Sequence, residues 1–184
     1  MQMNFENMGF TGKWKQLFGD PEKVFHIMIW GGEGSGKSTF SIGFAKYLAT
    51  CLKQRVCYVA GEQLISSTLQ SIIRRLDAVD DRLIFEPKLV QNYAEYDFVF
   101  IDSVTFLALS HDDLKKLQED NPKVNFVYVL QALKDSSGYY GERKIGHLVD
   151  IKVVVEREDK NTSIARIDDK NRFGGTGSME VDFG

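Results

Sequence analysis

The hydrophobic residues of this chain follow two alternating patterns. Short, nearly continuous apolar runs, typical of buried strands, are separated by longer segments whose apolar residues recur at the spacing of one helix face. Strands are predicted at 24–30, 56–60, 83–85, 98–101 and 125–130. Helices are predicted at 39–53, 63–76 and 111–119. Strands that alternate with helices favour a mainly parallel sheet flanked by helices, and such sheets bind ligands at the carboxyl ends of their strands.

The pattern changes after the last of these strands. A polar, glycine-containing segment at 131–147 is predicted to be a loop. Two runs at 151–156 and 163–167 then alternate like strands, and a turn at 159–161 would join them as antiparallel neighbours. We therefore expect an α/β domain over residues 24–184, with a mainly parallel sheet and an antiparallel C-terminal edge.

Residues 1–23 form a mixed lead-in segment before the first predicted strand. Its aromatic residues lie at near-helical spacing and are Phe5, Phe10, Trp14 and Phe18. This spacing predicts side chains that cover one end of the core of the domain. A contact between subunits, or a flap that stacks on nucleic-acid bases, is the alternative.

Composition and charge narrow the class of protein. The chain has 184 residues, of which 43% are hydrophobic and 27% charged, as in an ordinary soluble domain. Its formal net charge is −3, so nucleic-acid binding would need a local basic patch. Cys51 and Cys57 lack the CxxC spacing of a zinc site, and no apolar window reaches the ~18 residues of a membrane span. We expect a soluble, cytoplasmic protein that uses neither zinc nor a membrane.

The stretch GGEGSGKST, between a predicted strand and a predicted helix, matches the pattern G-x-x-x-x-G-K-[ST] of a phosphate-binding loop. Its glycines let successive backbone N–H groups point into one concavity, and the following helix presents its positive end to an anion. The predicted nucleotide-binding residues are Gly31, Gly32, Glu33, Gly34, Ser35, Gly36, Lys37, Ser38 and Thr39. Lys37 would reach the β- and γ-phosphates of ATP, Ser38 would bind Mg²⁺, and Glu33 would point outward.

Three further residues at strand ends suit ATP hydrolysis. Asp102 ends the apolar run 98–101, as expected of the Walker B aspartate that helps to hold Mg²⁺. Glu62 follows the neighbouring strand and could act as the general base on the attacking water, or could be an ordinary acid in a first helix turn. Gln131 ends another strand, where an uncharged donor could sense the γ-phosphate, or could be a loop residue without a role.

Several stretches resemble the ATPases of the RecA type. The phosphate loop is similar to theirs, VCYVAGEQ (56–63) to their strand and catalytic glutamate, and FVFIDSVTF (98–106) to the Walker B strand of RadA. KNRFG (170–174) matches the signature pentapeptide of bacterial RadA/Sms proteins, and IGHLVDIKVVVER (145–157) resembles the RadA stretch that precedes it. The resemblance covers roughly residues 24–177.

The resemblance implies a RecA-like P-loop ATPase that assembles into rings or filaments, with ATP held between subunits. Lys170 and Arg172 would then reach the γ-phosphate of a neighbouring subunit, because a cation supplied in trans stabilises transition-state charge. RadA proteins also carry a zinc module and a protease-like domain, for which this chain has neither the cysteines nor the length. The loop at 131–147 replaces the RadA loop that carries a histidine before the lysine, and Gln131 takes that place here, which is closer to RecA. A minimal core, such as a phage or mobile element would encode, is the expectation.

By the same resemblance, the segment 131–147 occupies the place of the second DNA-binding loop of RecA-like proteins. The candidate contacts with single-stranded DNA are Lys134, Tyr139, Tyr140, Arg143 and Lys144. Cations can hold phosphates, and aromatic rings can stack on unpaired bases. A flexible surface loop without a ligand is the alternative, because Asp135 and Glu142 dilute the positive charge. A second basic group, Arg74, Arg75 and Arg82, is expected to be a solvated helix face.

Three functions are open at this point. A DNA-dependent ATPase of recombination, repair or replication explains the phosphate loop, Glu62, Asp102, the 131–147 segment and KNRFG together. A nucleotide-dependent assembly switch that binds no DNA is favoured somewhat by the low net basicity. A small-molecule kinase shares the phosphate loop, but the sequence has no arginine-rich lid and KNRFG would go unexplained.

Overall fold

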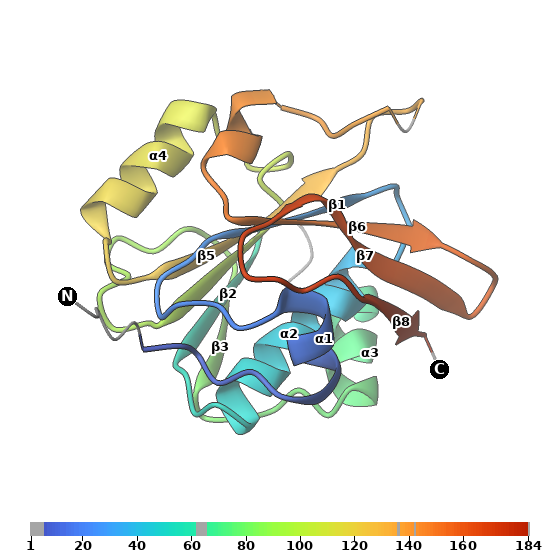
Figure 1. Cartoon of the computed structure of the whole chain (residues 1–184), viewed down its shortest axis with the longest axis horizontal. Helices are drawn as coiled ribbons and strands as arrows, with labels where there is room; N and C mark the ends of the chain where they lie inside the picture. Colours follow the sequence, from blue (N-terminus) through green and yellow to red (C-terminus); the bar gives the residue numbers. More distant parts are fainter. Residues whose placement is uncertain (1–5, 62–65, 136, 142, 184) are drawn as a thin grey trace.

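The computed structural model describes residues 6–61, 66–135, 137–141 and 143–183 (Figure 1). In this part of the chain one eight-stranded sheet has the order β3-β2-β4-β5-β1-β6-β7-β8. The strands are β1 (Ile27–Gly31), β2 (Val56–Ala60), β3 (Leu83–Glu86), β4 (Phe98–Asp102), β5 (Asn125–Gln131), β6 (Ile151–Arg157), β7 (Thr162–Asn171) and β8 (Ser178–Asp182). The helices are α1 (Gly12–Phe18), α2 (Lys37–Thr50), α3 (Ser67–Arg75), α4 (His111–Asp120) and the 3₁₀ helix η1 (Arg143–His147).

The sheet is parallel from β3 to β6 and antiparallel at its other edge. Every neighbouring pair from β3 across to β6 runs parallel, whereas β7 pairs antiparallel with both β6 and β8. The predicted α/β class, a mainly parallel sheet with an antiparallel C-terminal edge, is therefore confirmed. The carboxyl ends of β1, β2, β4, β5 and β6 meet at one end of the sheet, where a ligand is expected.

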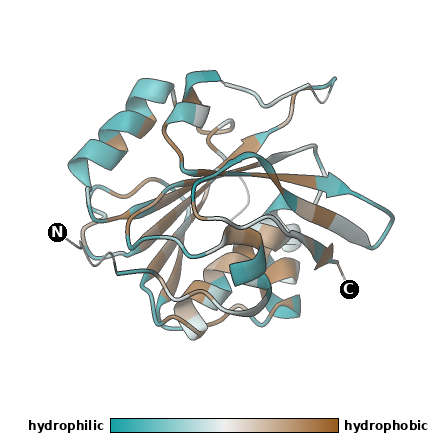
Figure 2. Ribbon diagram, in the orientation of Figure 1, coloured by the Kyte–Doolittle hydropathy of each residue, from teal (hydrophilic) through white to brown (hydrophobic). Residues whose placement is uncertain are grey.

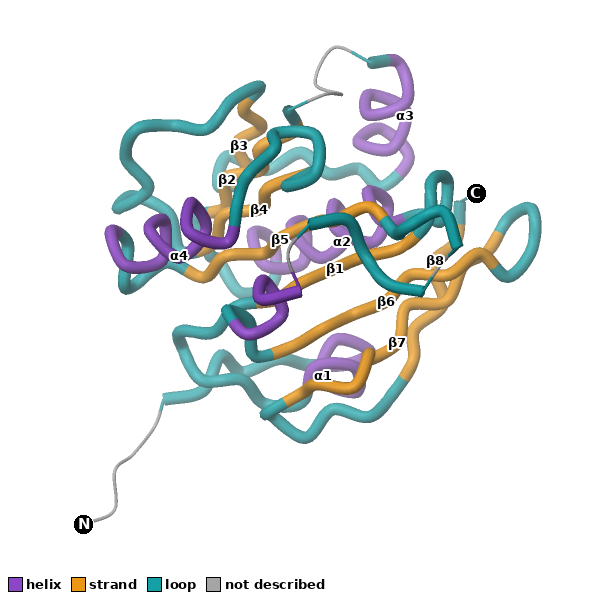
Figure 3. The backbone as a smooth tube through the Cα atoms, turned by 90° about the horizontal axis from the view of Figure 1, so that it is seen from above, coloured by secondary structure: helices purple, strands orange, loops and turns teal. Residues whose placement is uncertain are grey.

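The central strands β1, β2, β4 and β5 are apolar on both faces because helices cover both sides of the sheet there. Within β1, Ile27 and Ile29 face the cluster formed with α1, α2 and α3, whereas Met28 faces the cluster formed with α4 and η1. Figures 1 and 3 show α1 and α2 on one side of the sheet and α4 on the other. Figure 2 shows hydrophobic strands at the centre and a hydrophilic outer surface on α4. Within the described residues, no helix is long and apolar enough to span a membrane.

The aromatic residues of the lead-in segment belong to the first of these clusters. Phe10, Trp14 and Phe18 are buried, and the Trp14 ring lies 4.9 Å from that of Phe44 on α2, centre to centre. Phe5 lies outside the described residues. The side-chain amide of Asn171 lies 3.1–3.3 Å from the carbonyl oxygens of Leu17, Phe18 and Gly175, so the end of β7 holds the C-terminal end of α1.

Three local predictions differ from the structure. The helix predicted at 39–53 begins at Lys37, directly after Gly36 closes the phosphate loop with a positive φ of 93°. The predicted loop at 131–147 contains the helix η1 and a short hairpin, in which Leu133 N–H donates to Gly138 O and Tyr140 N–H to Gln131 O, both at 2.7 Å. The strand β8 was not predicted as a separate element, because only Met179 and Val181 carry its apolar alternation.

Candidate nucleotide-binding site

The phosphate loop joins β1 to α2 at the carboxyl end of the sheet. Gly36 has φ 93°, a conformation that L side chains rarely adopt, and Gly31 approaches β6 so closely that a Cβ would lie 2.3 Å from Val155 O. Glycine is therefore required at both positions. Lys37 Nζ donates to Gly32 O at 2.5 Å, which closes the loop on itself. The loop thus presents its backbone and the start of α2 to one cavity.

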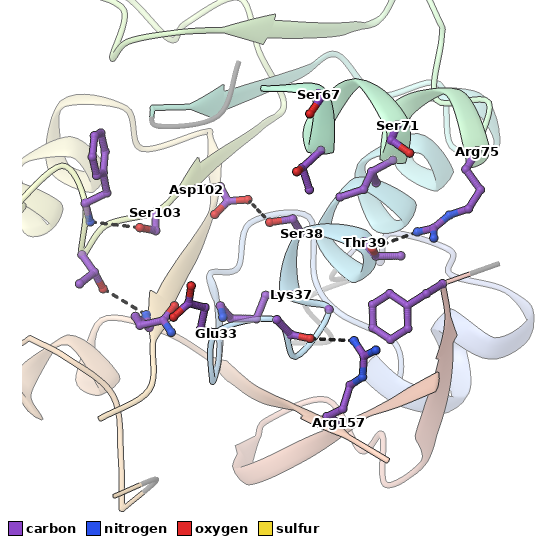
Figure 4. Close-up of a pocket in the computed structure, with 18 residues that line it drawn as sticks. Glu33, Lys37, Ser38, Thr39, Ser67, Ser71, Arg75, Asp102, Ser103 and Arg157 are labelled. Carbon is purple, nitrogen blue, oxygen red and sulfur yellow. Dashed lines mark hydrogen bonds between the residues drawn. The ribbon is translucent and has the colours of Figure 1, made fainter. Parts of the chain in front are cut away.

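This cavity has a volume of about 1020 Å³ and is shown in Figure 4. Its lining from the phosphate loop and α2 is Glu33, Gly34, Gly36, Lys37, Ser38 and Thr39. The helix α3 contributes Ser67, Thr68, Ser71, Ile72 and Arg75, and the strand ends and following loops contribute Asp102, Ser103, Thr105, Phe106, Gln131, Arg157 and Phe183. Six of the nine predicted nucleotide-binding residues therefore line one space together with Asp102 and Gln131, whereas Gly31, Gly32 and Ser35 do not line it.

Asp102 is joined to the phosphate loop through a hydroxyl group. Its Oδ2 accepts a hydrogen bond from Ser38 Oγ at 2.9 Å and another from Tyr58 Oη at 2.6 Å. Burial raises the pKa of this carboxyl group, and the hydrogen bonds from Tyr58 and Ser38 oppose that rise. A hydroxyl and a carboxylate side by side at a phosphate loop are the oxygen ligands that Mg²⁺ uses in such sites. The residues present therefore fit Mg²⁺ held at Ser38 with the help of Asp102.

Lys37 is the cation of the loop. Burial lowers the pKa of its ammonium group, and the carboxylates of Asp102 and Glu33 counteract part of this effect. Glu33 itself is exposed and lies at the rim of the cavity. A partly desolvated ammonium group gains more from a phosphate than one in open water, because electrostatic attraction is stronger where water is excluded.

Gln131 lies between the phosphate loop and the loop that follows β4. It ends β5, the strand between β1 and β4, and it is paired in register with Gly31 at the start of the phosphate loop. Its backbone N–H donates to Thr105 Oγ1 at 3.1 Å, and its carbonyl accepts from Tyr140 in the short hairpin. Gln131 thus connects the cavity both to the loop after β4 and to the segment 131–147.

Glu62, the predicted general base, lies outside the described residues. The two residues before it in the chain lie beside Asp102, because Ala60 is paired with Asp102 and Gly61 N–H donates to Asp102 O at 3.1 Å. Its role as a base therefore stays a prediction.

Arg157 and Phe183 line the cavity but were missed in the sequence. The Arg157 guanidinium donates to the carbonyl oxygens of Gly34 at 2.9 Å, Asp159 at 2.6 Å and Lys160. It also lies over the Phe183 ring, 4.4 Å from the ring centre. Arg157 is the last residue of β6, the strand next to β1. A cation at the carboxyl end of a predicted strand was the signal in the sequence that could have identified it. Nothing in the sequence pattern singles out Phe183.

Arg75 corrects another expectation, because it is not simply part of a solvated helix face. It is exposed, yet its Nη2 donates to Thr39 Oγ1 at 3.2 Å and its guanidinium lies 6.0 Å from the centre of the Phe183 ring. Arg82 lies outside any helix, just before β3, so the three arginines do not form one face. The prediction failed because the apolar spacing of α3 says which face is buried and not what its polar face meets.

The KNRFG segment lies away from the phosphate loop of its own chain. Asn171 is paired with Ile151, at the start of β6, whereas the phosphate loop lies beside the end of β6. Lys170 Nζ donates to Gly146 O at 3.1 Å, and Arg172 forms an ion pair with Asp150 at 3.1 Å. Any contribution of Lys170 or Arg172 to hydrolysis would therefore have to be made in another subunit.

The five DNA-contact candidates have different surroundings. Lys134, Arg143 and Lys144 are exposed, and the Tyr140 side chain is 38% exposed. Tyr139 packs its ring against Trp30, with ring centres 5.9 Å apart, and its hydroxyl lies 3.3 Å from Arg143 O. Tyr140 is thus the tyrosine whose ring is open to a ligand.

The sheet has the RecA-like P-loop fold, and Ser38, Asp102 and Gln131 share one cavity at its carboxyl end. No protein-family model matches the sequence, and no curated protein matches it. The flagellar accessory protein FlaH from Methanocaldococcus jannaschii superposes with a TM-score of 0.70 at 14% identity, over 96% of this chain and 93% of that chain. A KaiC-like protein from Pyrococcus horikoshii superposes with a TM-score of 0.63 at 17% identity, over 97% of this chain and 94% of that chain. The nearer resemblance to RadA stays a prediction.

Proposed function

We propose that this protein binds MgATP in the cavity between the phosphate loop and α3 and hydrolyses its terminal phosphoanhydride bond. The observation that carries the proposal is the 2.9 Å hydrogen bond from Ser38 Oγ to Asp102 Oδ2 inside that cavity. Backbone N–H groups of residues 31–38 hold the phosphates, and Lys37 neutralises the β- and γ-phosphates. Bound Mg²⁺ would supply further neutralisation of the charge that develops on the leaving phosphate.

The remaining residues of the site have positions that suit turnover. Glu62 orients and deprotonates the attacking water, and Gln131 hydrogen-bonds the γ-phosphate and transmits its presence to the segment 131–147. Lys170 and Arg172 complete the site of a neighbouring subunit, which makes hydrolysis depend on assembly into a ring or filament.

Single-stranded DNA is the proposed activator of hydrolysis. The segment 131–147 continues directly from Gln131, and its cations Lys134, Arg143 and Lys144 are exposed beside the open ring of Tyr140. Cations and an aromatic ring are the groups that bind unpaired nucleotides without sequence preference. A role in recombination, repair or replication follows from this proposal.

A nucleotide-dependent assembly switch is the second candidate. It is favoured by the Tyr139 ring, which is packed against Trp30 and is not available for stacking on a base. The similarity in fold to a flagellar accessory protein also favours this candidate.

Steady-state ATP hydrolysis, with and without single-stranded DNA, tests these proposals when light scattering follows assembly in the same samples. We expect hydrolysis that DNA stimulates and that rises with assembly. Hydrolysis and assembly that are both indifferent to DNA would replace the first candidate with the switch.

Lys37→Ala should abolish nucleotide binding, measured by titration with a fluorescent ATP analogue, while leaving the thermal unfolding of the free protein near that of the wild type. Glu62→Ala should bind the analogue normally but turn over ATP at least ~10²-fold more slowly, the usual contribution of a general base. Loss of binding and turnover together in Glu62→Ala would contradict the assignment of Glu62 as the base.

A further inference from the structure

The helix α3 presents a polar stripe to the cavity. Ser67, Ser71 and Arg75 recur every four residues, which puts them on one face of the helix, and all three line the cavity. Figure 4 shows this face of α3 opposite the start of α2. The opposite face is held by Leu69, which is 1% exposed and belongs to the core, and Lys46 on α2 donates to Leu76 O at 2.7 Å just after the helix. The stripe is therefore fixed relative to the phosphate loop.

Arg75 is the cation of this stripe. In the described part of the chain, no carboxylate forms an ion pair with it, and it contacts the neutral Thr39 hydroxyl and the face of the Phe183 ring. A guanidinium has five N–H donors in a planar fork that suits phosphate oxygens. Its surroundings thus suit an anion that enters the cavity.

The hydroxyls of Ser38 and Thr39 point to different sides of the cavity and so give a direction to the bound phosphates. Ser38 Oγ reaches Asp102 on the side of Gln131, where the bond to be hydrolysed would lie. Thr39 Oγ1 is reached by Arg75, on the side of Phe183. A triphosphate that runs along the loop would therefore place its terminal phosphate at Asp102 and the phosphate nearest the ribose at Arg75.

We propose that Arg75 binds the α-phosphate of the nucleotide and that this contact contributes to affinity rather than to the chemical step. This inference rests on the proposed function and adds to it a residue that recognises the nucleoside end of the phosphate chain. Thr39 holds the guanidinium in place before the nucleotide enters.

Arg75→Gln tests this role, because glutamine retains a donor for Thr39 and removes the charge. Equilibrium binding of ATP and of ADP should weaken by the same factor, about 10- to 100-fold, the usual effect of a hydrogen bond to a charged group. The kcat for ATP should stay within about twofold of the wild type, while KM rises, because both ground and transition states lose the same contact. Arg75→Lys should recover part of the affinity, because the charge is kept and the fork is lost.

Arg74→Gln is the matched control. Arg74 is the exposed neighbour on the same helix, and it does not line the cavity. Its replacement removes one positive charge without removing a contact, so the affinities for ATP and for ADP should each change by less than about twofold. Unchanged affinity in Arg75→Gln, equal losses in both variants, a loss for ATP alone, or a lower kcat at unchanged KM would each overturn the inference. If the wild-type protein binds neither nucleotide, the proposed function itself fails. If Arg75→Gln loses affinity, a folded Arg75→Lys variant shows whether the loss comes from the missing contact or from a misfolded protein.

Discussion

At the scale of single residues, Asp102 shows a conflict between stability and ligand binding. Asp102 is half-buried. Its carboxylate accepts hydrogen bonds from two hydroxyl groups and forms no ion pair within the described residues, and the Lys37 ammonium group offsets only part of the rise that burial causes in its pKa. Burial of an ionised group costs free energy unless an opposite charge compensates it. Under the proposed function, the same charge would help to hold Mg²⁺ in the complex with ATP, where the metal ion would offset this cost.

Asp102→Asn should therefore stabilise the free protein and at the same time weaken binding of MgATP. Asparagine keeps an oxygen that can accept from Ser38 and Tyr58, and it removes the buried charge. The melting temperature at neutral pH should rise, by about 2–4 °C for each kcal/mol gained in a domain of this size. Differential scanning calorimetry without nucleotide measures the rise, and a lower melting temperature of the variant would contradict the prediction.

The pH dependence of this difference gives a control. Folding raises the pKa of Asp102, so the folded state is favoured by protonation and loses stability as the pH rises through the raised pKa. The gap in melting temperature between Asp102→Asn and the wild type should thus be largest at neutral pH and should shrink as the pH is lowered. A gap that is constant with pH would point to packing rather than charge.

The residues that the sequence could identify are those whose chemistry follows from their place on one element. Lys37 and Ser38 belong to a contiguous motif, and Asp102 and Gln131 stand at the ends of apolar runs that had to be neighbouring parallel strands. Arg75, Arg157 and Phe183 reach the cavity from segments that are distant in sequence. Their approach depends on how α3 docks and how the antiparallel edge curves, which local periodicity does not specify.

At the scale of elements, the KNRFG segment has a structural role that is separate from any role in catalysis. Asn171 holds the end of α1, and the Phe173 ring packs against Phe25 with ring centres 5.8 Å apart. A Cβ on Gly175 would lie 2.2 Å from Leu17 O, so glycine permits the close approach of this turn to α1. Parts of the KNRFG segment, together with Gly175, therefore fasten α1 to the sheet.

Asn171→Ala should destabilise the domain by about 1–3 kcal/mol, because it leaves carbonyl groups at the end of α1 without their donor. Arg172→Ala is the comparison at the adjacent position, and it should cost less than ~1 kcal/mol, since the Arg172 side chain is 63% exposed and water screens its ion pair with Asp150. Urea denaturation followed by tryptophan fluorescence measures both. Equal effects in the two variants would show that Asn171 does not hold α1.

The sequence could predict the parallel core of the sheet better than its margins. The strands β1, β2, β4 and β5 are apolar runs, and both faces of each are buried. The α1 helix, the hairpin after Gln131 and β8 are short, and much of their order comes from contacts with distant segments, such as Asn171 with α1. Short elements of this kind have little periodicity from which to be recognised.

At the scale of the whole molecule, the cavity and the KNRFG segment lie toward opposite ends of β6. A subunit could therefore use its phosphate loop on its own nucleotide and present Lys170 and Arg172 to the nucleotide of a neighbour. This arrangement suits a head-to-tail assembly, in which each interface is made from two different surfaces.

Arg172→Ala should lower kcat on the order of 10³-fold without abolishing ATP binding, the effect usual for a cation supplied in trans. Mixing this variant with Lys37→Ala should restore hydrolysis above the sum of the two separate activities. Restoration is expected because mixed interfaces combine an intact phosphate loop with an intact Arg172. Activity that only adds on mixing would mean that Arg172 does not act across an interface, and light scattering of the mixture verifies that the subunits assemble.

The hydrogen bonds that join the end of β7 to the end of α1 also affect the order of events during folding. The hydrogen bonds from Asn171 to Leu17 and Phe18 join positions 154 and 153 residues apart. On the ribosome, residues 12–18 emerge early but cannot find this partner until the chain has grown past residue 171. The aromatic side chains of α1 can pack earlier, because Phe40, Phe44 and Tyr47 on α2 follow soon after them in the sequence. The carbonyl groups at the end of α1, in contrast, lack their donor for most of synthesis, and this end of the helix is expected to be fixed last.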